Sequence, residues 1–250
     1  MTHTQRLPVS AWICGLLALV LFAGLTFMPG TTLITDGLIA VAAALATAFT
    51  WLCTRQFDKT ERPRHIWFHF TLGLGLWTLG EILWLIYSIF TEAIPTPSLG
   101  DGAWLSGYIF LTIALLAQYR LIWGAHPRQE RRALLFGGVG VLAGAALIAS
   151  RASSQDRVMI FINAFYPLAD LAIALAALWL AHAFGSGQWG RPWQALWLFA
   201  LADAVYAWLT GTGLYQAGGL PASLADTLYF GAYVVLVLAS YSQYRLVKRA

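Results

Sequence analysis

Two carboxyl side chains, Glu81 and Asp203, interrupt long apolar stretches of the sequence. Each lies far enough into its stretch, at a rise of about 1.5 Å per helical residue, to reach well inside a bilayer. Ionisable groups at such depth are rare, face the protein interior and mark candidate functional sites. Two such carboxyls can divide the work of a general acid and a general base. The alternative is structural, with each carboxyl hydrogen-bonded to a neighbouring helix.

The surroundings of the two acids follow one local pattern: a small residue, the acid, and an aromatic residue three positions later. It reads Gly80-Glu81-x-x-Trp84 in one stretch and Ala202-Asp203-x-x-Tyr206 in the other. Residues three apart on a helix share a face, so acid and aromatic ring are expected to line one pocket; simple aromatic packing is the alternative. The predicted ligand-binding residues are Glu81, Trp84, Asp203, Tyr206, Trp77 and Asp170, and Glu81 and Asp203 are also the candidates for catalysis.

Serine followed three residues later by an aspartate occurs twice, as Ser98 with Asp101 and as Ser223 with Asp226. The pattern is typical of a capping box, in which serine and acid pair with backbone amides at a helix start. Unpaired amides near hydrocarbon cost several kcal/mol. These four residues are therefore predicted to be helix caps.

Cofactor ligands are few. His69 and His182 lie near the ends of apolar stretches and would have to face each other to ligate haem or a pigment such as a chlorin; solvated side chains are the alternative. No His/Cys spacing predicts a metal site, and both lysines, Lys59 and Lys248, lie outside the apolar stretches, which argues against retinal. The cofactor is left open.

The elements that must position these residues are membrane helices. Hydrophobic residues make up 59% and charged residues 10% of the 250 residues, against roughly 45–50% and about 25% in soluble domains. The polar connections are too short for a soluble catalytic or DNA-binding domain, so no nucleic-acid partner is expected. The predicted fold is all-α, with eight membrane spans at about 11–28, 33–53, 66–90, 102–123, 133–150, 158–183, 193–212 and 224–244.

The chain also contains an internal repeat. Gln118-Tyr119-Arg120-Leu121 recurs as Gln243-Tyr244-Arg245-Leu246, and at the same offset Trp104 meets Tyr229 and Tyr108 meets Tyr233. This predicts two four-helix repeats, 1–125 and 126–250, within one membrane domain. Because each repeat has an even number of spans, the two enter the membrane in the same direction and are related by a pseudo-two-fold axis along its normal.

Orientation follows from the cations. All of the 15 Lys and Arg residues except Arg151 and Arg157 fall at span ends that the eight-span prediction places on one side. The positive-inside rule puts that side, with both termini, in the cytoplasm of a multi-pass inner-membrane protein. The same cations are expected to contact lipid headgroups.

The short motifs resemble a known group of membrane regions. Trp77-x-x-Gly80-Glu81-x-x-Trp84, followed by Pro97-Ser98-Leu99-x-Asp101, is similar to the multi-spanning sensor regions that precede diguanylate cyclases in many bacteria. The resemblance implies a ligand-sensing or accessory module. The sequence ends at Ala250 without a cyclase, so a stand-alone module that is not an enzyme is the first expectation, with a small apolar ligand or a membrane-protein partner.

A second resemblance points to an enzyme. The acids in the third and seventh spans are similar to the layout of lysoplasmalogenase-like membrane hydrolases, which implies that Glu81 and Asp203 would protonate a vinyl ether and activate water. Glu81 stands where that family has an aspartate, and the family's early lysine-proline element is missing. A third alternative is a subunit of a larger membrane complex, with its aromatic surface packed against protein partners or pigments.

Overall fold

The computed structural model describes residues 7–91, 97–124, 139–141, 143–144, 157–185 and 187–248. Within these ranges the chain is helical and forms no strand. The long helices are α1 (Val9–Thr26), α2 (Thr32–Thr54), α3 (Arg62–Phe90), α4 (Leu99–Trp123), α6 (Arg157–Phe184), α7 (Arg191–Gly211) and α8 (Leu220–Val247), with a short 3-10 helix, η1 (Gln188–Gly190), before α7.

Six of these helices are long and apolar enough to cross a membrane: α1, α2, α3, α4, α6 and α8. The prediction of an all-α multi-pass membrane protein is confirmed to that extent. The seventh predicted span corresponds to α7, which carries polar and aromatic residues and does not reach the same hydropathy. Most of the fifth predicted span, 133–150, and the predicted repeat boundary at 125 lie outside the described residues.

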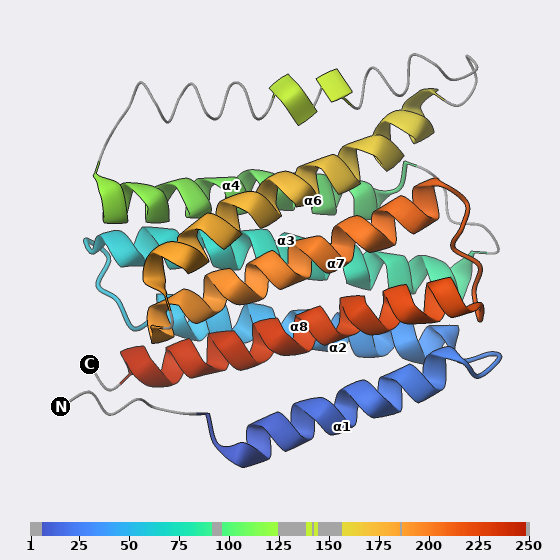
Figure 1. The fold of residues 1–250 in the computed structure, drawn as a ribbon, viewed down its shortest axis with the longest axis horizontal. Coiled ribbons are helices and arrows are strands. Elements are labelled where there is room, and N and C mark those ends of the chain that lie inside the picture. Colours follow the sequence, from blue (N-terminus) through green and yellow to red (C-terminus); the bar gives the residue numbers. More distant parts are fainter. Residues whose placement is uncertain are drawn as a thin grey trace.

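The helices lie along one another in a single bundle (Figure 1). α1 begins and α8 ends at the same end of the bundle, where the α2–α3 and α6–α7 connections also lie. The opposite end holds the α1–α2 and α7–α8 turns. α3 packs between α2 and α4, α7 packs between α6 and α8, and α8 also contacts α2 and α1. The third and seventh predicted spans are thus inner helices, each flanked by two others.

The centre of the bundle is aromatic. Trp77 on α3 and Phe199 on α7 are both buried, with ring centroids 5.0 Å apart. Trp77 also packs against Tyr108 at 5.3 Å, and Phe199 against Tyr233 at 4.5 Å. The outer faces are apolar as well; Val9 on α1 is 72% exposed. Such an exposed apolar surface is expected where the solvent is lipid.

Glycines bring α3 and α4 close together. A Cβ atom added at Gly80 would lie 2.3 Å from Nε1 of Trp104, and one added at Gly107 would lie 2.5 Å from Cδ1 of Trp77. Neither contact is sterically possible without movement, so both indoles occupy space that only a glycine leaves free. The small residue beside Glu81 thus fixes the place of Trp104.

Candidate functional site

A cavity of about 570 Å³ lies at the end of the bundle that holds the α1–α2 and α7–α8 turns. Its volume falls within the range of roughly 300–1,000 Å³ that is usual for small-molecule sites. Residues from all seven long helices and from both turns border it. The residues that carry its polar and aromatic character are Asp36, Trp77, Glu81, Trp84, Asp101, Trp104, Asn163, Tyr166, Asp203, Tyr206, Thr210, Tyr215, Asp226 and Tyr229.

Acidic residues concentrate in this cavity. Of the 11 Asp and Glu residues in the sequence, five border it, and no Lys, Arg or His is among its described lining residues. The five come from five different helices: Asp36 from α2, Glu81 from α3, Asp101 from α4, Asp203 from α7 and Asp226 from α8. The cavity wall is therefore rich in carboxyl groups that have no basic partner within it.

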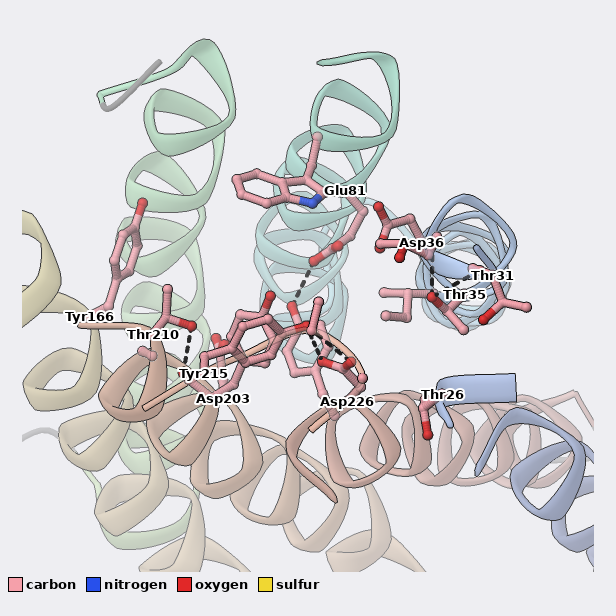
Figure 2. Close-up of a pocket in the computed structure, with 18 of the residues that line it drawn as sticks. Thr26, Thr31, Thr35, Asp36, Glu81, Tyr166, Asp203, Thr210, Tyr215 and Asp226 are labelled. Atoms are coloured by element: carbon pink, nitrogen blue, oxygen red, sulfur yellow. Dashed lines mark hydrogen bonds between the residues drawn. The ribbon is translucent and has the colours of Figure 1, made fainter. Parts of the chain in front are cut away.

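Glu81 is buried on α3 and receives its hydrogen bonds from α8. The Tyr229 hydroxyl donates to Oε1 at 2.6 Å, and the Tyr233 hydroxyl donates to the same oxygen at 3.3 Å. Figure 2 shows Glu81 extending into the space that Asp36 also enters from α2. Among the described residues no hydrogen bond reaches the second oxygen, Oε2. The Trp104 indole lies beside this carboxyl, but its N–H meets hydrogen-bond geometry with no described residue.

Asp203 borders the cavity from α7 and has a second carboxyl behind it. Asp170 on α6 is fully buried and lies within hydrogen-bonding reach of Asp203. Two carboxyls share a hydrogen bond only when one of them holds a proton. The Tyr108 hydroxyl donates to Oδ1 of Asp170, while Oδ2 receives no hydrogen bond from a hydroxyl or amide of the described residues. Tyr108, Asp170 and Asp203 form a chain of polar groups that ends at the cavity.

Asp101 combines two roles. Ser98 accepts from the Asp101 backbone amide at 3.2 Å, and the Asp101 carboxylate accepts from the Ser98 amide at 2.6 Å, so α4 begins with a complete capping box. The other carboxylate oxygen accepts from the Tyr166 hydroxyl at 2.7 Å. Because Asp101 borders the cavity, this helix cap is also part of the cavity wall.

The corresponding cap on α8 is not formed, and that prediction is wrong. α8 begins earlier than predicted, at Leu220, and has Gly219 at its N-cap and Pro221 in its first turn, where proline is well tolerated. Ser223 therefore lies inside the helix, and its hydroxyl donates to the Thr26 carbonyl at the end of α1, at 3.1 Å.

Asp226 bonds to the α7–α8 turn instead. The Tyr215 hydroxyl donates to both of its carboxylate oxygens at 3.0 Å, and Figure 2 shows both bonds. Burial, with a further contribution from Asp226, raises the pKa of the Tyr215 hydroxyl above its ordinary value. Tyr215 therefore stays protonated and serves as a donor. The turn is thereby fixed against the cavity wall.

Aromatic rings form much of the remaining wall. Tyr206 stacks on Tyr229 with centroids 5.4 Å apart, and Trp84 lies 6.1 Å from Trp104. Trp84 and Tyr206 are the residues three positions after Glu81 and Asp203, so both repeats of the local motif place an aromatic ring next to their acid.

The structure places five of the six predicted ligand-binding residues around one cavity: Glu81, Trp84, Asp203, Tyr206 and Trp77. Asp170 does not border it and contacts it only through Asp203. Neither His69 nor His182 borders it: His69 Nδ1 pairs with the His65 carbonyl at 2.7 Å, and His182 is exposed. The role of these residues in binding or catalysis stays a prediction.

The sequence motifs indicate only part of the wall. They predict Asp101 and Asp226 as helix caps alone, and Tyr166 and Tyr215 belong to no motif. Tyr229 does carry a sequence signal, since it is the repeat counterpart of Trp104 at an offset of 125. Both members of that pair border the cavity.

The chain has no match among protein-family models, curated proteins or solved structures.

Proposed function

We propose that this protein is a ligand-sensing module of the inner membrane, which binds a small organic molecule in the cavity that the seven long helices border. The observation that carries the proposal is the cavity itself. It has the volume of a small-molecule site, aromatic walls and a few carboxyl groups, and one of them, on Glu81, has an oxygen that no described residue satisfies. Apolar walls with a few convergent polar groups are the usual makeup of such sites.

The proposal includes the topology: eight spans in two parallel four-helix repeats, with both termini in the cytoplasm. Two kinds of contact support it. α2 packs on α8 as α6 packs on α4, and Trp77 packs on Tyr108 as Phe199 packs on Tyr233. In this arrangement the cavity opens toward the side of the membrane away from the cytoplasm, where it would sample external molecules.

Sensing would follow from where the ligand sits. A molecule in the cavity touches α3 and α4 of the first proposed repeat and α6, α7 and α8 of the second. A ligand shifts an equilibrium only by its difference in affinity for the two states. Contacts that span both repeats provide such a difference, because they change when one repeat moves against the other.

A cavity-filling substitution tests the proposal. The protein in nanodiscs of zwitterionic lipid is screened by ligand-observed ¹⁹F NMR against water-soluble fluorinated aromatic fragments that are cationic, neutral or anionic. Ala207→Trp places an indole in the cavity wall, whereas Leu201→Trp adds the same side chain on the exposed part of α7. We expect at least one fragment whose binding is lost in Ala207→Trp and kept in Leu201→Trp. If no fragment distinguishes the two variants, the cavity is not a ligand site.

Hydrolysis of a vinyl-ether lysophospholipid is the second candidate. It is favoured by one observation, the Asp170 carboxyl in contact with Asp203 at a cavity that Glu81 also borders. One carboxyl would protonate the vinyl carbon that is not bonded to the ether oxygen. Another would take a proton from a water molecule as the water oxygen bonds to the vinyl carbon that carries the ether oxygen. The hemiacetal then yields a fatty aldehyde and the glycerophospho-alcohol, to which the proton returns.

Aldehyde release from a lysoplasmalogen distinguishes the two candidates. If the protein is this hydrolase, Glu81→Gln and Asp203→Asn abolish aldehyde formation, while Asp58→Asn, an exposed acid in the α2–α3 connection, leaves it unchanged. Absence of aldehyde with the unaltered protein removes the enzyme candidate and leaves the sensor proposal as it stands.

A further inference from the structure

We infer that the ligand of this cavity is an organic cation: an amine or quaternary ammonium group carried on an apolar or aromatic body. The inference rests on the proposed function and specifies its ligand class. Three independent features of the wall lead to it: its charge, the oxygens that are left without a donor, and its aromatic surface.

The first feature is charge. Five carboxyls border the cavity, and its described lining contains no Lys, Arg or His. Away from bulk water a charge is costly unless it is paired. Hydroxyls donate hydrogen bonds to four of these carboxyls: Tyr229 and Tyr233 to Glu81, Tyr166 to Asp101, Tyr215 to Asp226 and Ser88 to Asp36. No hydroxyl supplies a positive charge. A bound cation would supply the charge that the wall lacks.

The second feature is a set of oxygens without donors. Glu81 is 8% exposed, and both of its hydrogen bonds end on Oε1, so Oε2 is left for an occupant of the cavity. Asp203 receives no hydroxyl or amide donor from the described residues; its only partner is the Asp170 carboxyl, with which it shares one proton. An ammonium group has donors and no acceptor, which makes it complementary to both positions.

The third feature is the aromatic surface. Trp84 and Trp104 stand beside Glu81, and the stacked pair Tyr206 and Tyr229 lies toward Asp226. Ring faces attract cations, and aromatic cages are the common means of binding quaternary ammonium groups. Such rings also accept the apolar body of the ligand.

A metal ion fits this wall less well. The described residues contain no group of three or more His, Cys, Asp or Glu side chains close enough to hold one. The five carboxyls are spread over five helices around a volume of about 570 Å³, which is far larger than an ion needs. Carboxyls spaced around a wide aromatic cavity suit a cation whose charge is attached to a bulky body.

The test uses two probes of the same shape and different charge: phenyltrimethylammonium and tert-butylbenzene. The protein is held in nanodiscs of zwitterionic lipid, and binding is followed by the fluorescence of its tryptophans and by the thermal unfolding midpoint. We expect the cation to bind at least about tenfold more tightly than the neutral probe, because ring faces attract a desolvated cation but not a neutral group of the same shape.

Matched variants assign that preference to the wall. Glu81→Gln and Asp203→Asn keep the shape of each side chain and remove its charge, and each should weaken cation binding about tenfold or more without changing the neutral probe. Asp58→Asn removes an exposed acid far from the cavity and should change neither. Trp84→Leu should weaken binding of the cation, whereas Trp179→Leu, on the exposed face of α6, should leave it unchanged.

Three results overturn the inference. If both probes bind equally and Ala207→Trp blocks both, the cavity is a ligand site but not a cation site, and only the inference fails. If neither probe binds and the fragment screen also finds nothing, the proposed function fails with it. Cation binding that survives Glu81→Gln and Asp203→Asn together places the probe elsewhere and likewise overturns the assignment.

Discussion

At the scale of single residues, the buried acids depend on donors that come from distant parts of the chain. Glu81 is bonded to Tyr229, 148 positions later, and Asp101 to Tyr166, 65 positions later. Each bond links a helix of the first half to one of the second. The polar groups that form the cavity wall therefore also hold the bundle together at that end.

The two tyrosines that donate hydrogen bonds to Glu81 should contribute differently to the stability of the protein. Tyr229→Phe removes the 2.6 Å bond and should lower the free energy of unfolding by about 1–3 kcal/mol, because hydrogen bonds to a carboxylate are among the stronger ones. Tyr233→Phe removes only the 3.3 Å bond and should cost less. Thermal unfolding in nanodiscs measures both, with Tyr241→Phe as a control away from the cavity. A larger loss at Tyr233 than at Tyr229 would contradict the geometry.

The serines of the two motifs should also differ. Ser98→Ala removes a true N-cap and should cost about 0.5–2 kcal/mol of stability. Ser223→Ala breaks a bond from α8 to the end of α1, so it should chiefly loosen α1. Hydrogen–deuterium exchange resolves the two: faster exchange is expected in the first turn of α4 for Ser98→Ala and around Thr26 for Ser223→Ala. Faster exchange at the start of α8 in the second variant would restore the cap assignment.

At the scale of elements, the pairing of α3 with α4 depends on where the glycines lie. Gly73 meets Leu111, Gly80 meets Trp104, and Gly107 meets Trp77, all at distances too short for a Cβ atom. Small residues that permit close backbone approach are the usual device for packing membrane helices. Here they also seat two indoles that border the cavity.

Gly80→Ala should therefore displace Trp104, since the new Cβ would lie 2.3 Å from its indole nitrogen. We expect a lower unfolding midpoint and a changed tryptophan emission spectrum. Gly75→Ala on the same helix is the matched control, because its Cβ would meet only Thr47, at an ordinary 3.6 Å, and alanine favours helix over glycine. Equal behaviour of the two variants would mean that Trp104 is not held in this position.

At the scale of the whole molecule, the arrangement puts the cavity and the chain ends at opposite ends of the bundle. α1 begins and α8 ends at the end of the bundle that holds the basic α2–α3 connection, with Arg55 and Lys59, and the start of α3, with Arg62 and Arg64. The positive-inside rule therefore predicts that this end faces the cytoplasm.

Cysteine accessibility checks this orientation. In a background with Cys14 and Cys53 replaced by alanine, Gln56→Cys in the α2–α3 connection should be protected from an impermeant maleimide in intact cells. Ala217→Cys in the α7–α8 turn should react, because that turn borders the cavity mouth. When fused after Ala250, a reporter that works only in the cytoplasm should be active, and one that works only outside the cytoplasm should be inactive. The reverse pattern of labelling would invert the topology and direct the cavity to the cytoplasm.

The sequence by itself determined the long apolar helices and those parts of the site that depend on neighbouring residues of one helix. Apolar length placed six membrane helices within a few residues of their bounds, since a bilayer sets how long such a stretch must be. The spacing of acid and aromatic residue on one helix predicted that Trp84 and Tyr206 stand beside Glu81 and Asp203, because residues three apart share a helix face. The Ser98 pattern also specified its cap, which needs only local contacts.

Only the tertiary structure decided which acids meet and what each one faces. In the sequence Asp36 lies near the start of an apolar stretch, and Asp170 lies shortly after a proline. Asp36 nevertheless enters the cavity, whereas Asp170 lies behind the cavity wall. The rotation of each helix against its neighbours sets that difference, and this rotation depends on packing among segments far apart in the chain. The surroundings of Asp226 were likewise decided by the tertiary structure. Because Gly219 and Pro221 start α8 one turn earlier than predicted, Asp226 forms no capping box with Ser223 and accepts a hydrogen bond from Tyr215 instead.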